Sequence, residues 1–212
     1  QHLVFLARQV HALAADLETY LDDASVADLD AFGVRYVLVA RGTTPPAGTW
    51  FVAARGAVQL WEVPGDGLVS AVDLLAPAQD VSHSDLAELL LPLMRTQGGS
   101  PTAVRQVRLE HRSPVVDPTA PAAGDDRPGT VTVTHEDLDA GRLAATTDFT
   151  RSGAVMVKAN WHPRWHAFVD GEEVPVVAVA PTWLAVPVPA GHHEVELRYE
   201  PWSGTWILGP LA

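Results

Sequence analysis

The residues with the clearest capacity for chemistry lie within residues 160–176, which read NWHPRWHAFVDGEEVPV. His162 and His166 stand four positions apart in this stretch, and so do Trp161 and Trp165. Two histidines at this spacing on one face of a helix bind zinc. Two tryptophans on one face of a strand can stack on the C–H faces of a sugar. The stretch therefore raises two hypotheses, a metal site and a carbohydrate platform.

The metal hypothesis fails on local geometry. Pro163 and the β-rich neighbourhood disfavour a helix, and on a strand His162 and His166 would lie about 13 Å apart, too far to share one metal ion. No third ligand stands nearby, and the adjacent His192 and His193 would face opposite sides of a strand. The sequence therefore predicts no metal site, and no motif calls for a cofactor.

The carbohydrate hypothesis remains open beside a structural alternative. Trp161 and Trp165 share a face if the strand is regular, and Trp183 adds a third indole nearby in the sequence. The alternative is that at least one of them is the core tryptophan of a β-sandwich. We select Trp161, Trp165 and Trp183 as the predicted carbohydrate-binding residues.

Catalytic motifs are weak. The sequence contains neither a G-x-S-x-G elbow nor a phosphate-binding G-x-x-x-x-G-K-[ST] loop. Ser82, His83 and Asp85 cluster in DVSHSD, but such clusters before a helix usually serve as caps. Spacing fixes no partner for the acidic residues Glu136, Asp137, Asp139 and Asp148. We therefore predict no catalytic residue.

Composition restricts the classes of partner. The chain has 212 residues and a formal net charge of -12, which argues against nucleic acid and disfavours docking on anionic lipid through a polybasic patch. The absence of cysteine excludes disulfides and thiolate metal sites. No apolar run reaches the length of a membrane span. The opening QHLVFLARQV and the closing WILGPLA both suggest a piece of a longer chain.

The first half of the chain shows helical signals. Apolar spacing predicts a helix at residues 5–21. Ser25, with Asp28 three positions on, is an approximate capping box for a short helix through residue 32, and Gly33 suits its left-handed end. Ser84 precedes a third helical pattern that ends at a pair of glycines.

Short β-branched apolar runs separate these helices and predict strands. They lie at residues 34–40, 57–63, 68–76 and 103–111. We therefore expect a mixed α/β region over residues 1–112. Residues 113–129 are dense in Pro, Ala, Asp and Gly, which predicts a linker or long loop.

From residue 130 the pattern changes to seven short runs separated by turn signals, such as the hairpin pair Asp170-Gly171. This spacing predicts an antiparallel β-sandwich, jelly-roll-like, over residues 130–206. Residues 207–212 form an apolar tail that could begin a membrane helix. The expected fold class for the whole chain is α+β.

The second half also contains a series of short motifs. It combines an aromatic-Pro-x-Trp corner, a Val-Asp-Gly turn, Val-Pro-Val, Val-Pro-x-Gly and a final His-x-Val-x-x-x-Tyr-x-Pro strand, at Trp161, Pro163, Trp165, Val169, Asp170, Gly171, Val174, Pro175, Val176, Val188, Pro189, Gly191, His193, Val195, Tyr199 and Pro201. This series of motifs resembles the C-terminal extracytoplasmic module of YfhO-like bacterial membrane proteins. Those proteins are similar to GT-C glycosyltransferases that use lipid-linked sugars. DLDAFGVRYVLVA, residues 28–40, resembles an element that precedes this module.

The resemblance implies a place on the extracytoplasmic face of the bacterial cell membrane, with attachment through flanking helices that are not in this chain. It also implies an envelope glycan or lipid-linked saccharide as the partner. The full-length parent would be related to GT-C-type glycosyltransferases. Their catalytic acid lies in an early loop, so this part is expected to be non-catalytic, positioning an acceptor glycan or supporting the catalytic half.

Two other classes stay open. One is a purely structural or protein-interaction module with buried tryptophans. The other is a free-standing secreted carbohydrate-active hydrolase, which would need two carboxylates about 5–10 Å apart in a cleft.

Overall fold

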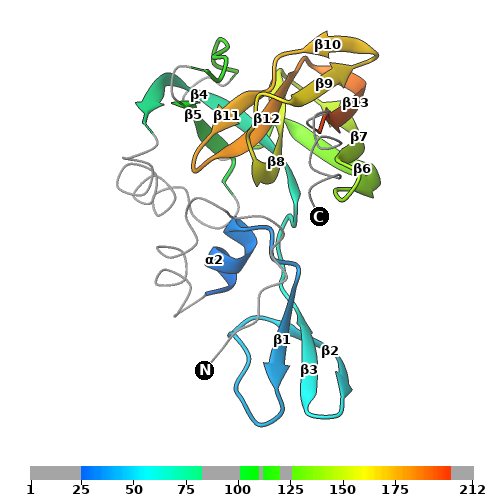
Figure 1. Cartoon of the computed structure of the whole chain (residues 1–212). Helices are drawn as coiled ribbons and strands as arrows, with labels where there is room; N and C mark the ends of the chain where they lie inside the picture. The colour runs from blue at the N-terminus through cyan, green and yellow to red at the C-terminus, as the bar shows by residue number, and fades with distance from the viewer. Residues whose placement is uncertain (1–24, 83–100, 110–111, 120–125, 202–212) are drawn as a thin grey trace, which may run out of the picture.

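The computed structural model describes residues 25–82, 101–109, 112–119 and 126–201 (Figure 1). The described chain is nearly all β, with one six-residue helix and strands in three groups. In the described ranges, no helix has the length and hydropathy that a membrane span requires.

The first group is a three-stranded antiparallel sheet, in the order β1-β3-β2, which extends away from the rest of the molecule (Figure 1). We call it the arm. It follows the short helix, and the elements are α2 (Val26–Ala31), β1 (Tyr36–Ala40), β2 (Trp50–Arg55) and β3 (Val58–Glu62). Val37 and Val39 alternate inward along β1 and are buried in one cluster with Leu29, Val34 and Val63, so α2 packs against β1 through Leu29.

Helix α2 begins and ends as the sequence predicts. The Ser25 hydroxyl accepts a hydrogen bond from the Asp28 N–H at 3.1 Å, and the Asp28 carboxylate accepts one from the Ser25 N–H at 3.2 Å. Gly33 follows with φ +68°, the left-handed conformation that glycine adopts without strain. The capping box is therefore confirmed.

The second group is a closed barrel with the strand order β11-β12-β8-β4-β5. Its strands are β4 (Val69–Val81), β5 (Ala103–Leu109), β8 (Gly153–Asn160), β11 (Val177–Val179) and β12 (Trp183–Val188). All neighbours are antiparallel except β4 and β5, which are parallel. The barrel interior is filled by buried side chains, among them Val72, Leu74, Val104, Met156, Val177 and Val179. Two strands thus precede residues 113–129 and three follow them.

The third group is a five-stranded antiparallel sheet, in the order β10-β9-β13-β7-β6. Its strands are β6 (Gly129–Asp137), β7 (Arg142–Phe149), β9 (Trp165–Val169), β10 (Glu172–Val174) and β13 (Gly191–Tyr199). Val195 and Leu197 point inward, as the alternation in β13 predicts, and pack with barrel residues such as Val155, Leu184 and Val186. This sheet and the barrel wall enclose the largest buried cluster.

The expected α+β class is wrong. The described part of residues 1–112 is built from strands, with α2 as its only helix, because its apolar runs are valine-rich and suit a pleated surface. The predicted helices at residues 5–21 and after Ser84 lie outside the described residues. The C-terminal strands also do not form a self-contained sandwich, since three of them complete the barrel.

Candidate ligand-binding cleft

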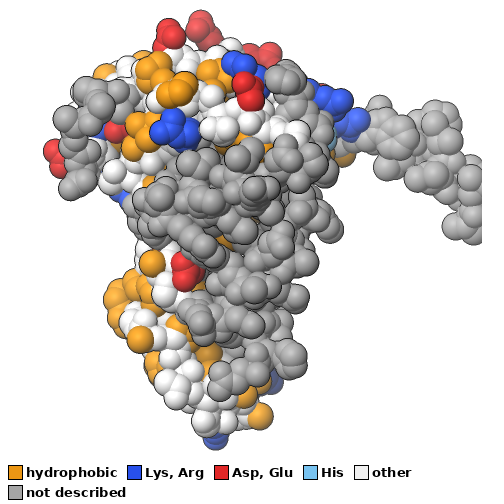
Figure 2. All heavy atoms as spheres, turned by 90° about the vertical axis from the view of Figure 1, so that its left-hand side faces the viewer, with side chains coloured by type: hydrophobic (Ala, Val, Ile, Leu, Met, Phe, Trp, Pro, Cys, Tyr) orange, Lys and Arg blue, Asp and Glu red, His pale blue; other side chains and the backbone are white. Residues whose placement is uncertain are grey.

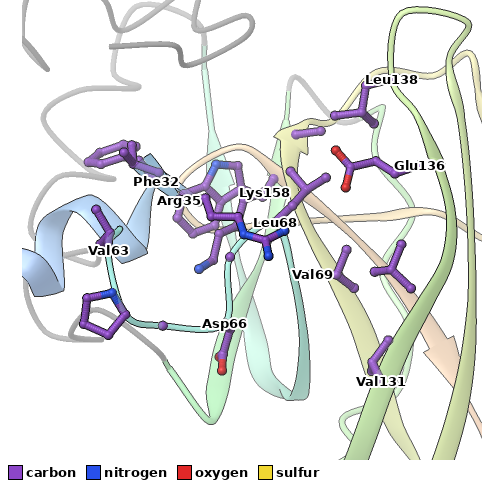
Figure 3. A pocket seen from close by; sticks show the side chains of 18 of the residues that line it. Phe32, Arg35, Val63, Asp66, Leu68, Val69, Val131, Glu136, Leu138 and Lys158 are labelled. Atoms are coloured by element: carbon purple, nitrogen blue, oxygen red, sulfur yellow. The ribbon is translucent and has the colours of Figure 1, made fainter. Parts of the chain in front are cut away.

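A cleft of about 740 Å³ opens where the arm, the β3–β4 connection, β6 and the barrel mouth meet (Figure 3). In Figure 3, Val131, Glu136 and Leu138 lie on one side, and Phe32, Val63 and Asp66 on the other. The volume lies within the range of small-molecule sites. Apolar side chains form much of the lining, and the polar ones are Arg35, Glu62, Asp66, Glu136, Lys158, Asn160 and Thr182.

Two glycines shape the wall that connects β3 to β4. Gly65 has φ +152°, and a Cβ there would lie 2.0 Å from the Asp30 Oδ1 atom. Gly67 has φ +67°, and its N–H donates to the same Asp30 oxygen at 3.3 Å. Only glycine at position 65 lets the connection pass this close to the end of α2.

A buried ion pair supports the same wall. Lys158, on β8, donates from Nζ to the Asp30 backbone carbonyl and to Asp30 Oδ1, the latter at 3.3 Å. Burial lowers the pKa of the Lys158 ammonium, and the charge of Asp30 opposes that shift. Because the ammonium bonds Asp30, Lys158 joins the barrel to α2.

A second ion pair, between Arg127 and Asp66, holds the connection from β3 to β4. Arg127 Nη2 lies 2.6 Å from Asp66 Oδ2, and Arg127 Nη1 donates a hydrogen bond to the Ala71 carbonyl oxygen at 3.3 Å. This pair ties the chain just before β6 to the β3–β4 connection. The cleft walls therefore come from distant parts of the sequence and are joined by charged contacts.

The most exposed aromatic residue at the cleft is Trp50, the first residue of β2, which is 61% exposed. In the sheet register it stands opposite Glu62, which also lines the cleft. Arg35 contributes a guanidinium to the same cleft and lies 5.6 Å from the centroid of the Tyr36 ring. An exposed indole near carboxylates and a guanidinium is suited to a ligand with apolar faces and hydroxyl groups.

The three predicted tryptophans do not form one platform. Trp183 is 7% exposed and packs edge-on against Phe32, with ring centroids 6.2 Å apart, although it lines the cleft. Trp161 and Trp165 are half-buried against the main core, where they donate from Nε1 to the carbonyls of Val176 and Asn160 at 2.8 and 3.2 Å. Neither of these two lines the cleft. Their contact with a glycan stays a prediction.

The histidines form separate pairs with carboxylates. His166 lies 2.8 Å from Glu173, His192 lies 2.9 Å from Asp148, and His193 lies 2.6 Å from Asp170. His162 packs near Tyr199, and burial lowers its pKa. No group of three possible metal ligands occurs among the residues that the structure describes.

The acidic residues noted in the sequence also separate. Glu136 lines the cleft, Asp137 accepts a hydrogen bond from the Ala140 N–H at 3.0 Å, and Asp148 pairs with His192. His83 and Asp85 lie outside the described residues, so their arrangement with Ser82 stays a prediction.

Trp50 was missed by the sequence analysis because β2 shows no alternation. All six of its residues are exposed, and the register shifts between Phe51 and Ala53. The available signal was an aromatic run that leads into Arg55-Gly56, with an alternating strand directly after it. Such a run predicts a hairpin edge strand.

Comparison with family models, with curated proteins and with solved structures finds no match to this chain.

Proposed function

We propose that this chain is a non-catalytic module that holds a glycan in the cleft beside Trp50. We further propose that it does so on the extracytoplasmic face of a bacterial membrane, as part of a protein concerned with cell-envelope glycan assembly. The observation that carries the binding proposal is the exposed Trp50 indole at a cleft that also presents Arg35, Glu62 and Glu136. The proposed location rests on the resemblance of residues 161–201.

The chemistry of the cleft suits a sugar. An indole offers a flat apolar surface for the C–H face of a pyranose or furanose ring. Carboxylates accept hydrogen bonds from hydroxyl groups, and a guanidinium donates them to ring and hydroxyl oxygens. With about 740 Å³ available, the cleft can take a short oligosaccharide segment.

The test is calorimetric titration of the chain with a panel of oligosaccharides released from bacterial envelope polysaccharides. We expect at least one member to bind and Trp50→Ala to weaken its binding by about tenfold or more, since the largest stacking surface is lost. Phe51→Ala is the matched control, because Phe51 is 55% exposed and adjacent but does not line the cleft. Absence of binding across the panel, or equal losses in both variants, would contradict the proposal and favour a structural or protein-interaction module.

One observation favours a second candidate, the secreted hydrolase. Glu62 and Glu136 both line the cleft, and a glycosidase needs two carboxylates at one site. Chromatography of the same oligosaccharides after long incubation separates the two functions. Products that disappear in Glu136→Gln would establish hydrolysis, whereas binding without products supports the non-catalytic role.

A further inference from the structure

Exposed apolar residues gather on the arm. The described residues expose eight large hydrophobic side chains, and six of these belong to the arm: Tyr36, Leu38, Trp50, Phe51, Val52 and Val58. Figure 2 shows hydrophobic side chains collected over the lower part of the molecule, which is the part the arm occupies in Figure 1. Single exposed apolar residues are ordinary, but such a concentration marks an interaction surface.

The register places several of these residues on one face of the arm. Leu38 stands opposite Leu60, and Ala40 stands opposite Val58. Side chains of directly paired residues point to the same side of a sheet. This face is therefore apolar around Leu38, Leu60 and Val58, with Glu62 at the end near the barrel and Arg55 at the far end. The other face carries Val37 and Val39, which are buried in the cluster that contains Leu29 of α2.

The arm is basic, although the chain as a whole is acidic. Residues 34–63 contain three arginines and one glutamate, a net charge of +2, and no other ionisable side chain that is charged at neutral pH. Since the whole chain carries -12, the remaining residues together carry -14. The overall charge that disfavours docking on anionic lipid is therefore unevenly distributed.

Two of the arginines lie at the free end of the arm. Arg55 stands opposite Val58 across the hairpin turn, and the Arg41 N–H donates to the Ala57 carbonyl at 2.8 Å. A five-residue strand such as β1 spans about 16 Å, which exceeds the Debye length of about 8 Å at physiological salt. Salt ions therefore largely screen these two guanidinium groups from the acidic charges of the barrel.

We propose that the arm docks on an anionic lipid bilayer, with Leu38 and Val58 entering the headgroup–acyl boundary and Arg41 and Arg55 contacting lipid phosphates. Aromatic and aliphatic side chains beside arginines are the combination that binds this interface. A second copy packed face to face with its arm parallel to the first would bring identical arginine-bearing ends together, so charge disfavours that arrangement. The four residues that the proposal places at the bilayer do not line the Trp50 cleft, so the two proposals can fail separately.

The test is flotation of the full chain with vesicles of phosphatidylcholine containing about 30 mol% phosphatidylglycerol, at about 0.05 M and about 0.5 M salt. We expect binding at low salt, little binding at high salt and little binding to pure phosphatidylcholine. Arg41→Glu with Arg55→Glu should reduce binding by about tenfold or more, because each arginine adds favourable energy at an anionic surface. Leu38→Ser with Val58→Ser should reduce it as well.

Val115→Ser is the matched control, because Val115 is a similarly exposed valine, at 38%, outside the arm. It should float like the unmodified chain. Absence of flotation at low salt, or an equal loss in Val115→Ser, would overturn the proposal. So would a dimer in size-exclusion chromatography that Leu38→Ser with Val58→Ser converts to a monomer without any vesicle binding, since the face would then join two copies.

Discussion

Lys158 of β8 and Asp30 of α2 form a buried ion pair between residues 128 positions apart in the sequence. Their side chains are 0% and 5% exposed. The Asp30 carboxylate also accepts a hydrogen bond from the Gly67 N–H, so one acidic residue connects the helix that precedes the arm, the barrel and the cleft wall. This contact therefore joins the helix that leads into the arm to the barrel.

Lys158→Met should lower the free energy of unfolding by about 3 to 5 kcal/mol, because it leaves the Asp30 carboxylate buried without its cation. Urea denaturation followed by tryptophan fluorescence measures the loss. Adding Asp30→Asn should cost less than the sum of the two single changes, since each removes the same interaction. If the losses of unfolding free energy from the two substitutions were strictly additive, Lys158 and Asp30 would not stabilise the fold through their mutual interaction.

Gly65→Ala and Gly67→Ala form a matched pair of substitutions that tests whether the close approach of Gly65 to Asp30 requires glycine. Both glycines have positive φ, but a Cβ at position 67 meets nothing within 4 Å, whereas one at position 65 collides with the Asp30 side chain. We expect Gly67→Ala to cost about 1 kcal/mol through backbone strain. Gly65→Ala should cost about 2 kcal/mol more, through overpacking. Thermal unfolding compares them, and equal losses would contradict the steric argument.

The pair formed by His193 and Asp170 should stabilise the fold most between pH 3.8 and 6.5, the ordinary pKa values of the two groups. The hydrogen bond to Asp170 raises the pKa of His193, so the contribution of the histidine is full below 6.5 and is lost as the pH rises through the raised pKa. The same bond lowers the pKa of Asp170, so its contribution is lost as the pH falls through the lowered value.

Asp170→Asn tests this pair while preserving the turn, because Asp170 has φ +52° and asparagine tolerates that conformation well. The NMR titration of the His193 ring should move toward 6.5 in this variant. A titration that matches that of the unmodified chain would show that Asp170 does not hold the proton on His193.

Arg151→Lys should destabilise the protein by about 1 kcal/mol. Arg151 contacts both carboxylate oxygens of Asp73, which is 5% exposed, and a lysine ammonium cannot reproduce the paired geometry. Arg198→Lys is the control, since Arg198 contacts Glu196 in the same two-point manner but both side chains are exposed. Chemical denaturation should show almost no change in the control, and equal losses would exclude burial as the cause.

Local features of the fold could be predicted from the sequence because neighbouring residues determine them. The cap formed by Ser25 and Asp28, the end of α2 at Gly33 and the turn at Asp170-Gly171 all follow from side-chain hydrogen bonds or backbone freedom within a few residues. The burial of Val195 follows equally from alternation along β13.

Strand partners and the surroundings of each aromatic ring could not be predicted in the same way. Trp183 is buried and Trp50 exposed, yet both begin a short strand with little polar alternation. Their difference arises from what the barrel and the arm place around them. The parallel pairing of β4 with β5 is likewise a relation between distant residues, and the sequence analysis predicted both strands without assigning them to each other.

Closure of the barrel pairs Val107 of β5 with Ala178 of β11, and Leu184 of β12 with Val157 of β8. A chain emerging from the ribosome therefore exposes β4 and β5 with unsatisfied strand edges until more than a third of the sequence, the part from the end of β5 to the end of β12, has followed. Refolding should be correspondingly slow, in milliseconds to seconds by stopped-flow fluorescence, because the loop entropy is lost before the distant strands pair. The interval before closure is when this protein is most exposed to aggregation and to proteases.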